Sequence, residues 1–459
     1  MMIFQKLREI AEARPDQLFL VDQVYSFSYE DAVNRVIKIA GQLENSKEDL
    51  VYLYLKDGCD LVLLLIAIDL LGKKACILNR QMAEVDFAAI FHKVGPGILI
   101  SDTKFDDAVS GTRIISYSDP LWHESFPDSK KEYNYPVDRE NDLIILTTGT
   151  TGLPKAALYK WETIIKQIRP NKRDLQEVWL LVSPLNHFAG IQVLLHSLVN
   201  GNALIIPPSR SFEDILTYIQ KYNVDSISAT PTFWRFFSGK YTKDLGPLNL
   251  KQITLGGEAS TPELLEKLRG IFPKAVITQV YATTELGSCF SVKDGLPGFP
   301  LEYLSRPVGN VKLKILQDEL YILSTKAMLG YAGGDVLQRD NDGWIATGDI
   351  VEIVGDRVLF RGRKSEIINV GGVKVHPLKV EAVILAIPGI KNVRVYGKKN
   401  PITGQIVAIQ VEISDDVSSE AIEKEIRFRC QSSLGRYEQP RLIEFVSSIP
   451  KQNQKIIRR

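Results

Sequence analysis

Short apolar runs alternate with helical patterns over residues 17–141. The runs of strand length are Leu18–Val21, Leu50–Tyr54, Ala75–Leu78 and Gly97–Ile100, and the helical patterns include Tyr29–Leu43 and Cys59–Leu71. Strands that are separated by helices of this length require crossover connections, which are right-handed and favour a mostly parallel sheet. The first part of the chain is therefore expected to be an α/β layer.

The same alternation continues from Trp179 to Glu285, and here each apolar run ends in a loop of small and polar residues. The expected strands are Trp179–Val182, Ala203–Ile206, Ser226–Ala229, Gln252–Leu255 and Val276–Gln279, and the expected helices are Ile191–Val199 and Phe212–Tyr222. In doubly wound sheets, ligands bind outside the carboxyl ends of the strands. The loops after these strands are therefore expected to converge on one cleft.

From about Arg306 the chain changes to short alternating runs with turn residues between them, which favours a small antiparallel or barrel-like unit. The charged, glycine-containing break Arg361–Lys364 predicts a domain boundary that divides the chain into residues 1–363 and 364–459. The second part has a size that can fold alone. The predicted class is α/β, with doubly wound sheets and a β-rich subdomain in a large N-terminal domain, followed by a small mobile α+β C-terminal domain.

The composition is that of a folded globular protein, with 45% apolar and 24% charged residues. The 56 basic and 55 acidic residues leave a formal net charge of +1, so the chain lacks the electrostatic footprint of a protein that binds nucleic acid or an anionic membrane. The most apolar run, Leu61–Ile68, lies between Asp60 and Asp69 and is far shorter than the roughly 20 residues of a membrane span. We expect neither nucleic acid nor a membrane span to take part in the function.

The 4 cysteines are scattered, with no CxxC pair and no histidine at ligand spacing nearby. This pattern predicts reduced, buried thiols in a cytoplasmic protein. The N-terminal segment is typical of a short amphipathic helix that ends before Pro15, and it lacks the layout of a signal peptide.

The candidate ligand site starts at the stretch TTGTTGLPK, residues 147–155, directly behind the apolar run Asp142–Leu146. Backbone N–H groups, hydroxyls and a lysine suit phosphate oxygens, so the expected ligand is a nucleotide triphosphate. The loop is not a Walker A motif, because Gly149 and Gly152 stand too close together and Pro154 precedes the lysine. By itself, the stretch is equally compatible with a Thr/Gly turn that carries a surface lysine.

Further segments make the nucleotide interpretation more specific. They are PLNHFAG (184–190), GGEAS (256–260), YATTE (281–285), DGWIATGD (342–349), GRKSEIINVGGVKVHP (362–377) and Lys455 near the C-terminus. Together with TTGTTGLPK, their order resembles the adenylate-forming superfamily, which contains acyl- and aryl-CoA synthetases, nonribosomal-peptide adenylation domains and firefly luciferase. The resemblance covers essentially the whole chain.

The resemblance implies that a carboxylate attacks the α-phosphate of ATP, giving acyl-AMP and pyrophosphate, and that a thiol then takes the acyl group. The β- and γ-phosphates would be held by Lys155 together with Thr147, Thr148, Gly149, Thr150, Thr151 and Gly152. Thr284 would bind the α-phosphate, and Glu285 would bind Mg²⁺, since a hard cation prefers carboxylate oxygen. Asp349, with Arg363 near it, would accept the ribose hydroxyls.

The resemblance also implies an adenine site and moving parts. Adenine would lie between Tyr281 and the segment made of Gly256, Gly257, Glu258 and Ala259, where glycines allow close backbone approach. Lys455 would bridge the substrate carboxylate and the α-phosphate. Lys364 matches the hinge about which the C-terminal domain moves. Gly371 and Gly372 would then border the path of the thiol arm.

The resemblance places His187 at the mouth of the acyl pocket, whose candidate residues are His187, Phe188, Phe233, Trp234, Leu255, Gly257, Val280 and Ala282. These are largely apolar and aromatic, and no charged residue is placed to pair an α-amino group, so an aryl or medium aliphatic carboxylate fits better than an amino acid. Ala282 replaces a glycine that is usual in the family and is expected to narrow the pocket. Departures at Asn186 and Gln454 are expected to tune the substrate without abolishing activity.

CoA is the expected thiol, because the chain ends shortly after Lys455 with no carrier-protein domain attached. One alternative is a freestanding ligase that loads the phosphopantetheine of a separate carrier protein, docked on a basic patch such as Lys391, Arg394, Lys398 and Lys399. A second alternative is a non-catalytic nucleotide-binding relative. Single residues also have simpler interpretations, as solvated charges or, for Phe233 and Trp234, as core aromatics.

Overall fold

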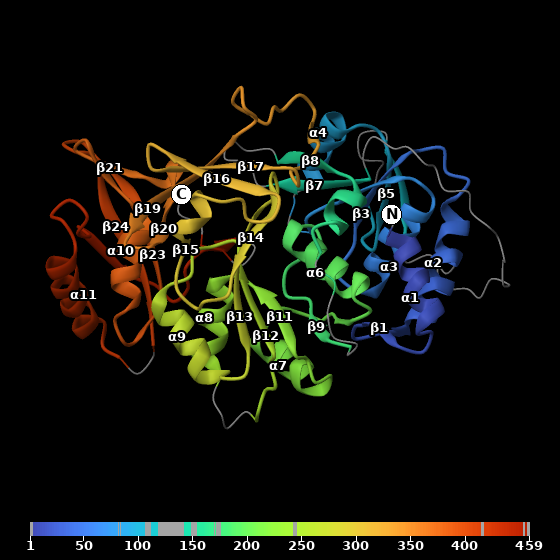
Figure 1. Ribbon diagram of the computed structural model, residues 1–459, viewed down its shortest axis with the longest axis horizontal. Helices are drawn as coiled ribbons and strands as arrows, with labels where there is room; N and C mark the ends of the chain where they lie inside the picture. The colour runs from blue at the N-terminus through green and yellow to red at the C-terminus, as the bar shows by residue number, and fades with distance from the viewer. Residues whose placement is uncertain are drawn as a thin grey trace.

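The computed structural model describes residues 3–80, 82, 84–105, 112–117, 142–147, 154–168, 170, 176–241, 246–414, 417–452 and 455–456. A large N-terminal domain and a smaller C-terminal domain lie at opposite ends of the molecule (Figure 1). The predicted mixed α/β class with two domains of unequal size is confirmed.

The first sheet joins strands from the start of the chain with strands from its middle, in the order β14-β13-β12-β11-β9-β10-β1-β2. Their bounds are β1 Leu18–Val21, β2 Ser26–Ser28, β9 Val178–Leu180, β10 Ala203–Ile205, β11 Ser226–Ala229, β12 Gln252–Gly256, β13 Val276–Thr283 and β14 Gly287–Val292. The strands from β1 to β13 run parallel along this order, and only β2 and β14 pair antiparallel. The carboxyl ends of β11, β12 and β13 therefore lie along one edge.

The second sheet has the order β18-β8-β7-β4-β3-β5-β6. Its strands are β3 Leu50–Tyr54, β4 Lys74–Ile77, β5 Ile98–Ser101, β6 Arg113–Ser116, β7 Leu143–Thr147, β8 Lys155–Tyr159 and β18 Gly330–Ala332. The strands from β7 to β6 are parallel, whereas β8 and β18 are added antiparallel at the edge. A short strand from late in the chain thus lies beside β8, which follows the TTGTTGLPK stretch.

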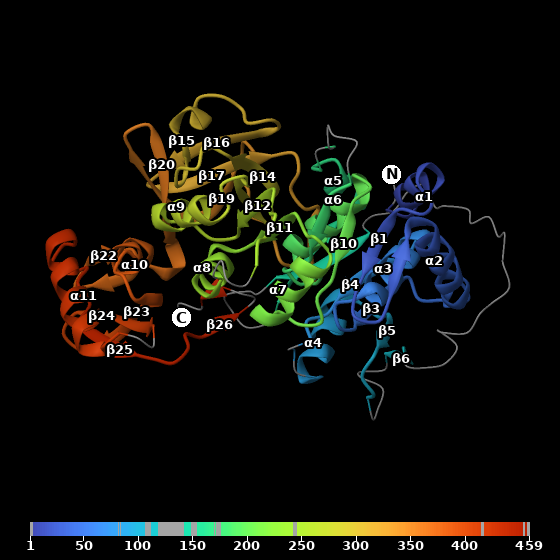
Figure 2. The same cartoon turned by 90° about the horizontal axis from the view of Figure 1, so that it is seen from below.

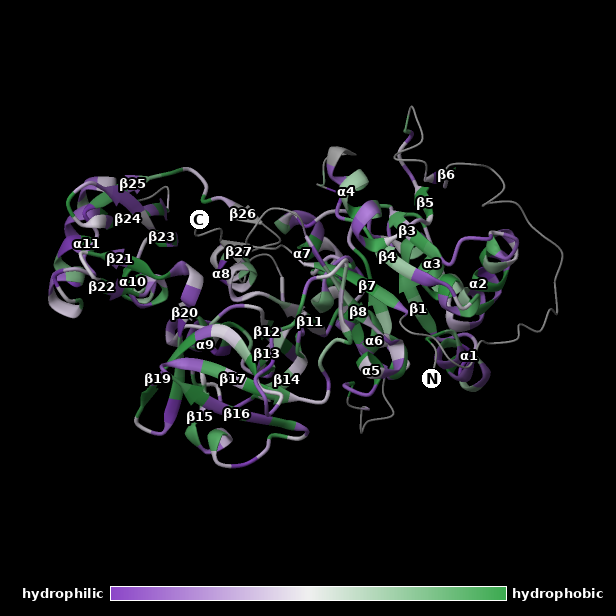
Figure 3. Cartoon of the chain, turned by 90° about the horizontal axis from the view of Figure 1, so that it is seen from above, coloured by the Kyte–Doolittle hydropathy of each residue, from purple (hydrophilic) through white to green (hydrophobic). Residues whose placement is uncertain are grey.

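Helices cover these sheets, and their bounds are α1 Ile3–Ala13, α2 Tyr29–Leu43, α3 Cys59–Leu70, α4 Glu84–Val94, α5 Trp161–Ile165, α6 Phe188–Val199, α7 Phe212–Lys221, α8 Pro231–Lys240 and α9 Pro262–Ile271. Helix α2 starts with a capping box, in which Ser28 and Asp31 exchange side-chain to backbone hydrogen bonds. Helix α3 is apolar on all sides and is buried except at Asp60. No helix in the described part of the chain is long and apolar enough to cross a bilayer. The central strands of the N-terminal domain are mostly hydrophobic (Figure 3).

An antiparallel sheet completes the N-terminal domain, as the alternating runs predicted. Its order is β15-β20-β19-β17-β16, with β15 Phe299–Pro300, β16 Val311–Leu316, β17 Glu319–Ser324, β19 Ile345–Val354 and β20 Arg357–Arg363, and a 3-10 turn, η4, at Leu301–Leu304. A second 3-10 turn, η5 Lys364–Glu366, follows β20 directly and leads into the C-terminal sheet.

The C-terminal domain has a sheet and a hydrophobic core of its own. Its elements are β21 Ile368–Val370, β22 Val373–Val375, α10 Pro377–Leu385, β23 Ile390–Asn400, β24 Gly404–Ile413, α11 Ser419–Ser433 and β25 Leu442–Phe445, followed by β26 Lys451–Gln452 and β27 Lys455–Ile456. Val375, Val393 and Ile409 are fully buried in this core. Apolar residues of α10 and the central strands thus form a module of their own.

Tyr281 and Ala282 lie on a strand, which corrects the prediction that they form a loop. The apolar run suggested that the strand ends at Gln279, but β13 continues to Thr283. The reason is the hairpin partner β14, which pairs Tyr281 with Phe290 and Ala282 with Ser288. Pairing of this kind is a tertiary effect that local propensity does not register.

The structure confirms the prediction that the thiols are buried. The four cysteines are free and buried, at Cys59, Cys76, Cys289 and Cys430. Burial raises the pKa of the Cys289 thiol to about 12 and that of Cys430 to about 11. These side chains are protonated core residues rather than reactive nucleophiles.

Candidate active site

Asp349 lies in a polar cluster that three strands form, and Asp349 itself is only 8% exposed. The hydroxyl of Tyr281 donates to Oδ2 at 2.5 Å, and Nε of Arg363 lies 2.8 Å from Oδ1. Arg363 is the cross-strand partner of Asp349, so the register of β19 and β20 brings the two charges together. Burial and the charge of Asp349 raise the pKa of Tyr281, which keeps its phenol a hydrogen donor. A carboxylate held in this way suits the predicted task of accepting hydroxyl hydrogens from a sugar.

The expected adenine site combines the segment Gly256–Ala259 with the ring of Tyr281. Gly257 has a φ of +79°, in the left-handed region that favours glycine. The ring of Tyr281 is stacked on Phe290 and Phe360, with centroid separations of 5.2 and 5.3 Å. The tyrosine ring is thus held rigidly by aromatic neighbours of its own, and its contact with adenine stays a prediction.

Glu258 has a partner that the sequence did not suggest. Its Oε2 accepts hydrogen bonds from the backbone N–H and the hydroxyl of Thr232, at 3.0 and 2.7 Å. Thr232 lies in the first turn of α8, where a carboxylate satisfies free N–H groups and interacts favourably with the helix dipole. Glu258 therefore ties the expected adenine segment to the start of α8.

The ends of the phosphate loop are held together by the β7–β8 hairpin. Thr147 pairs with Lys155 across it, and the Thr147 hydroxyl donates to the carbonyl of Lys155 at 3.4 Å. The ammonium of Lys155 lies 5.2 Å from the ring centroid of Tyr331, a cation–π distance. The loop residues between these ends lie outside the described residues, and they include Thr148, Gly149, Thr150, Thr151 and Gly152.

Two tyrosines of the second sheet hold the loop that carries Thr284 and Glu285. Tyr159 on β8 donates to the carbonyl of Thr284 at 2.5 Å. Tyr331 on β18 donates to Oε1 of Glu285 at 2.9 Å. The loop after β13 is therefore anchored to the edge strands of the other sheet. This arrangement brings the predicted metal carboxylate and the predicted phosphate lysine to a common tyrosine.

The surroundings of Glu285 fit the predicted Mg²⁺. In nucleotide sites this ion is commonly held by one or two carboxylates and by substrate phosphates. Among the described residues, no group of three or more His, Cys, Asp or Glu side chains could hold a metal. The described residues can therefore provide one carboxylate, that of Glu285, which would share the cation with phosphate oxygens. Mg²⁺ bound there would neutralise part of the phosphate charge.

His187 is the N-cap of α6 and lies where the loop after β9 turns into that helix. Its backbone N–H donates to the carbonyl of Pro184 at 3.1 Å. The neighbouring departure from the family, Asn186, is partly exposed in the same loop. The position of His187 at a helix start is compatible with the predicted mouth of the acyl pocket, and that role stays a prediction.

The predicted pocket residues separate into two groups. The more buried group is Phe188, Phe233, Trp234 and Leu255, with exposures of 6, 6, 0 and 1%. Trp234 also donates its indole N–H to the carbonyl of Thr254 at 3.1 Å, which makes it a core side chain, as the simpler interpretation had it. Val280 and Ala282 on β13 stay partly exposed, and Gly257 is exposed. The predicted pocket residues on β13 are therefore more accessible than the four buried ones, and their contact with a substrate stays a prediction.

Lys364, the predicted hinge residue, is tied to the N-terminal domain by an ion pair. Its ammonium lies 2.8 Å from Oε2 of Glu319, whose side chain is 7% exposed. Oε1 of the same carboxylate accepts the backbone N–H of Gly348 at 3.0 Å. Because Gly348 precedes Asp349, one buried carboxylate links the hinge position to the turn that carries the predicted ribose acceptor.

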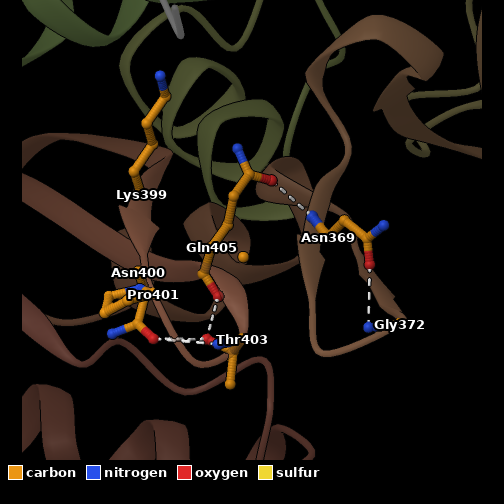
Figure 4. A pocket seen from close by; sticks show the side chains of 8 residues that line it. Asn369, Gly372, Lys399, Asn400, Pro401, Thr403 and Gln405 are labelled. Atoms are coloured by element: carbon orange, nitrogen blue, oxygen red, sulfur yellow. Dashed lines mark hydrogen bonds between the residues drawn. The ribbon is translucent and has the colours of Figure 1, made fainter.

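Gly371 and Gly372 form the tip of the β21–β22 hairpin. Their φ angles of +58° and +88° lie in the region that a two-residue hairpin turn requires of glycine. The N–H of Gly372 donates to Oδ1 of Asn369 at 3.1 Å. The hairpin borders a pocket of the C-terminal domain (Figure 4), lined by Asn369, Gly372, Lys399, Asn400, Pro401, Thr403, Gly404 and Gln405. Turn geometry thus requires these glycines, and their predicted role beside a thiol arm stays a prediction.

Lys455 lies in the terminal hairpin, where it pairs with Gln452. This hairpin extends from the C-terminal domain toward α8 in Figures 2 and 3. The tail therefore returns toward the N-terminal domain, and the role of Lys455 stays a prediction. The departure at Gln454 lies outside the described residues.

Sequence reasoning missed Tyr159, Tyr331 and Glu319, each of which contacts a predicted site residue or its loop. Tyr331 and Glu285 are 46 positions apart, and Tyr331 on a strand of the second sheet meets Glu285 in the loop between β13 and β14 of the first sheet. No spacing rule connects them. The one readable signal was the alternation along β8, which places Lys155 and Tyr159 on the same face of the sheet.

Two family models match the chain. The model of the AMP-binding enzyme family matches residues 7–331, and that of the AMP-binding enzyme C-terminal domain matches residues 379–455. Similar curated proteins include 2-succinylbenzoate–CoA ligases from Staphylococcus epidermidis and Bacillus subtilis. Each is 25% identical, over 97% of this chain and 94% of the relative.

Similar solved structures show the same fold. The o-succinylbenzoate CoA synthetase from Bacillus subtilis, in complex with its acyl-adenylate intermediate, has a TM-score of 0.80 at 22% identity, covering 100% of this chain and 97% of that one. The anthranilate CoA ligase AuaEII, in complex with anthranoyl-AMP, has a TM-score of 0.86 at 18% identity, covering 100% and 95%. The matched sequence models span both domains, and the chain belongs to the AMP-binding enzyme family.

Proposed function

We propose that this protein activates a carboxylic acid with ATP, through acyl-AMP and with release of pyrophosphate, and transfers the acyl group to CoA. One observation carries the proposal: β13 and the loop that follows it contact residues at both ends of the predicted ATP site. Tyr281 on β13 bonds Asp349, the predicted ribose acceptor, at 2.5 Å. Glu285, in the loop after β13, accepts a hydrogen bond from Tyr331, whose ring lies below the Lys155 ammonium. The full-length similarity to CoA ligases supports this function.

In the first half-reaction, an oxygen of the substrate carboxylate forms a bond to the α-phosphorus, and the bond from that phosphorus to pyrophosphate breaks. Catalysis of such a step consists of positioning and electrostatic stabilisation. Lys155 offsets negative charge on the leaving phosphates, and Asp349 fixes the ribose. Lys455 places a further cation between the carboxylate and the α-phosphate. Glu285 would hold Mg²⁺, which would supply additional positive charge to the phosphates.

In the second half-reaction, the CoA thiolate attacks the acyl carbonyl and AMP leaves. We place the domain boundary between Arg363 and Lys364, where β20 ends and η5 begins. Rotation about this point would bring the Gly371–Gly372 hairpin to the site. Because these two glycines have no side chains, the hairpin would leave room for a narrow thiol arm. In this cycle the hinge allows the domain rotation, and the two glycines make room for the thiol arm.

The acid is proposed to be an aryl carboxylate. The accessible part of β13 offers Val280 and Ala282, which are apolar. The similar proteins include ligases named for 2-succinylbenzoate and for anthranilate, both aromatic acids. An apolar surface of this kind suits the ring of an aryl acid.

The test is pyrophosphate release from ATP and Mg²⁺ across aryl acids, including 2-succinylbenzoate and anthranilate, short and medium aliphatic acids, and amino acids. Each acid is assayed with and without CoA. A signal that depends on an aryl acid, and that CoA converts into thioester, is the expected result. Lys455→Met should abolish the signal, whereas Lys451→Met in the same tail should not. A signal without thioester would indicate loading of a carrier protein, and ATP binding with no turnover on any acid would indicate a non-catalytic relative.

A further inference from the structure

Tyr331 contacts both predicted ends of the phosphate site, and neither the sequence motifs nor the comparisons give it a role. Its hydroxyl donates to Oε1 of Glu285 at 2.9 Å, and the Lys155 ammonium lies 5.2 Å from its ring centroid. The register explains this position. Tyr331 pairs with Ala157 on β8, and strand alternation puts Lys155 and Tyr159 on the same face as Ala157. Tyr331 therefore lies diagonally between those two side chains.

Each half of the Tyr331 side chain suits its neighbour chemically. The phenol O–H of Tyr331 donates a hydrogen bond to the Glu285 carboxylate, which accepts it. A carboxylate whose one oxygen is held by a donor can offer the other oxygen to a cation, with its orientation already set. The electron-rich ring face attracts the Lys155 ammonium and limits its rotamers. The two charges that would face the phosphates are thus held by one side chain.

The segment after β18 is tied to the phosphate loop by a second set of contacts. Lys93 on α4 forms an ion pair with Asp335 at 2.5 Å. The same ammonium donates to the carbonyl of Pro154 at 3.2 Å, next to Lys155. Residues 330–335 therefore contact the β7–β8 hairpin at two points. Tyr331 contacts Lys155 directly, and Asp335 is linked to Pro154 through Lys93. A segment with only a packing role would not need polar contacts to both the loop and Glu285.

We propose that Tyr331 is a positioning residue that couples Lys155 to Glu285 and so pre-organises the site for the triphosphate with its magnesium ion. This inference rests on the proposed ATP-dependent function. It assigns Tyr331 no contact with the reacting atoms. The coupling matters for Mg·ATP, which engages both charges, and not for AMP, which lacks the β- and γ-phosphates.

The experiment compares Tyr331→Phe, which keeps the ring over Lys155 and removes the hydrogen bond, with Tyr331→Leu, which removes both. Tyr321→Phe and Tyr321→Leu are matched controls, because the Lys314 ammonium lies 5.6 Å from the ring centroid of Tyr321, which is on β17 in a different sheet from Tyr331. Binding of Mg·ATP, of ATP with a chelator and of AMP is measured by calorimetry with the full-length protein. The Mg²⁺ concentration for half-maximal binding of ATP is measured in parallel, and thermal unfolding reports folding.

We expect Tyr331→Phe to weaken Mg·ATP binding about tenfold, the usual effect of losing a hydrogen bond to a charged group, and to raise the Mg²⁺ requirement. AMP binding should stay within about twofold, and Tyr331→Leu should lose affinity for ATP even without Mg²⁺, because the lysine is released. The Tyr321 variants should bind all ligands as the unaltered protein does.

Equal weakening of AMP and Mg·ATP binding would show that Tyr331 merely supports the fold, and an unchanged Mg²⁺ requirement in Tyr331→Phe would also overturn the proposal. These readouts are binding constants that need no turnover, so they test the role of Tyr331 separately from the proposed ligase activity. If no acid supports pyrophosphate release, the proposed function fails, while the Mg·ATP and AMP affinities of the variants still decide the role of Tyr331.

Discussion

Gly190 approaches Pro184 so closely that no side chain fits between them. A Cβ on Gly190 would lie 2.1 Å from the carbonyl oxygen of Pro184 and 2.9 Å from that of Ser183. Both obstacles are backbone atoms, so a side chain there requires the loop to move. The first turn of α6 and the loop that carries His187 are thereby packed into one unit.

Gly190→Ala should therefore destabilise the protein by about 1–3 kcal/mol and displace His187. Gly239→Ala is the control, because Gly239 lies in α8 with nothing within 4 Å of an added Cβ, and alanine there should stabilise the helix by about 0.5–1 kcal/mol. Urea denaturation measures both effects. Equal stability of Gly190→Ala and the unaltered protein would show that the loop adapts easily.

The stability of the N-terminal domain should fall in mildly acidic solution because of His196 on α6. Burial lowers the pKa of His196 below its usual value of 6.5, and the charge of Glu177 opposes this shift only in part. A lowered pKa in the folded state means that the unfolded chain takes up the proton first. The stabilising contribution is therefore complete above about pH 6.5 and is lost as the pH falls through the lowered value.

Thermal unfolding of the unaltered protein and of His196→Gln, measured from pH 7.5 to pH 5, tests this expectation. The variant should show a smaller loss of stability on acidification, because glutamine takes up no proton in this range. Parallel curves for the two proteins would mean that other groups cause the acid sensitivity.

A methyl group at the tip of the β21–β22 hairpin should slow the thioester-forming half-reaction and leave the adenylate-forming half-reaction nearly unchanged. Gly372 has a φ of +88°, so Gly372→Ala adds both strain and bulk at the predicted path of the thiol. We expect thioester formation to fall by about tenfold or more, with acid-dependent pyrophosphate exchange nearly unchanged. Gly355→Ala, in the β19–β20 turn at a φ of +61° and with open space around it, controls for backbone strain. An equal loss of both half-reactions would count against a role for the hairpin in the thiol step.

The ion pair between Lys364 and Glu319 should restrict the orientation of the C-terminal domain. Spin labels at Val24 and Ile402, which are 74% and 89% exposed, report the distance between the domains. Lys364→Ala should broaden this distance distribution, since it removes the contact from the hinge to the N-terminal domain. Lys424→Ala, an exposed lysine of α11, should leave it unchanged. A narrow, unshifted distribution in Lys364→Ala would show that other contacts fix the domains.

Replacement of Ala282 should change the size of acid that the protein accepts. Ala282 lies on β13 at a partly exposed position, and Ala282→Gly removes one methyl group from the pocket wall. Since a methylene is worth about 10- to 200-fold in discrimination, the variant should gain activity on bulkier aryl acids relative to small ones. The ratio of kcat/KM for a large and a small acid measures the effect. No change in this ratio would place the acyl group elsewhere.

Much of the architecture was readable because local patterns and global fold agree. The helix Tyr29–Leu43 and the strand Leu50–Tyr54 have the bounds that the apolar pattern predicted. The change to short alternating runs after Arg306 predicted the antiparallel subdomain, and the charged break at Arg361–Lys364 predicted a second, smaller domain. Where prediction failed, as at Tyr281 and Ala282, a strand was extended by a hairpin partner that local propensity does not register.

The sequence by itself determined the residue types of the site, because phosphate, metal and sugar each require particular side chains and these stand in recognisable motifs. Only the tertiary structure decided which side chains hold them. Asp349 and Arg363 meet through strand register, Glu319 joins the hinge to the turn before Asp349, and Tyr331 reaches Glu285 across two sheets. Such contacts depend on how sheets pack and pair over long separations, and no local period along the chain records that packing.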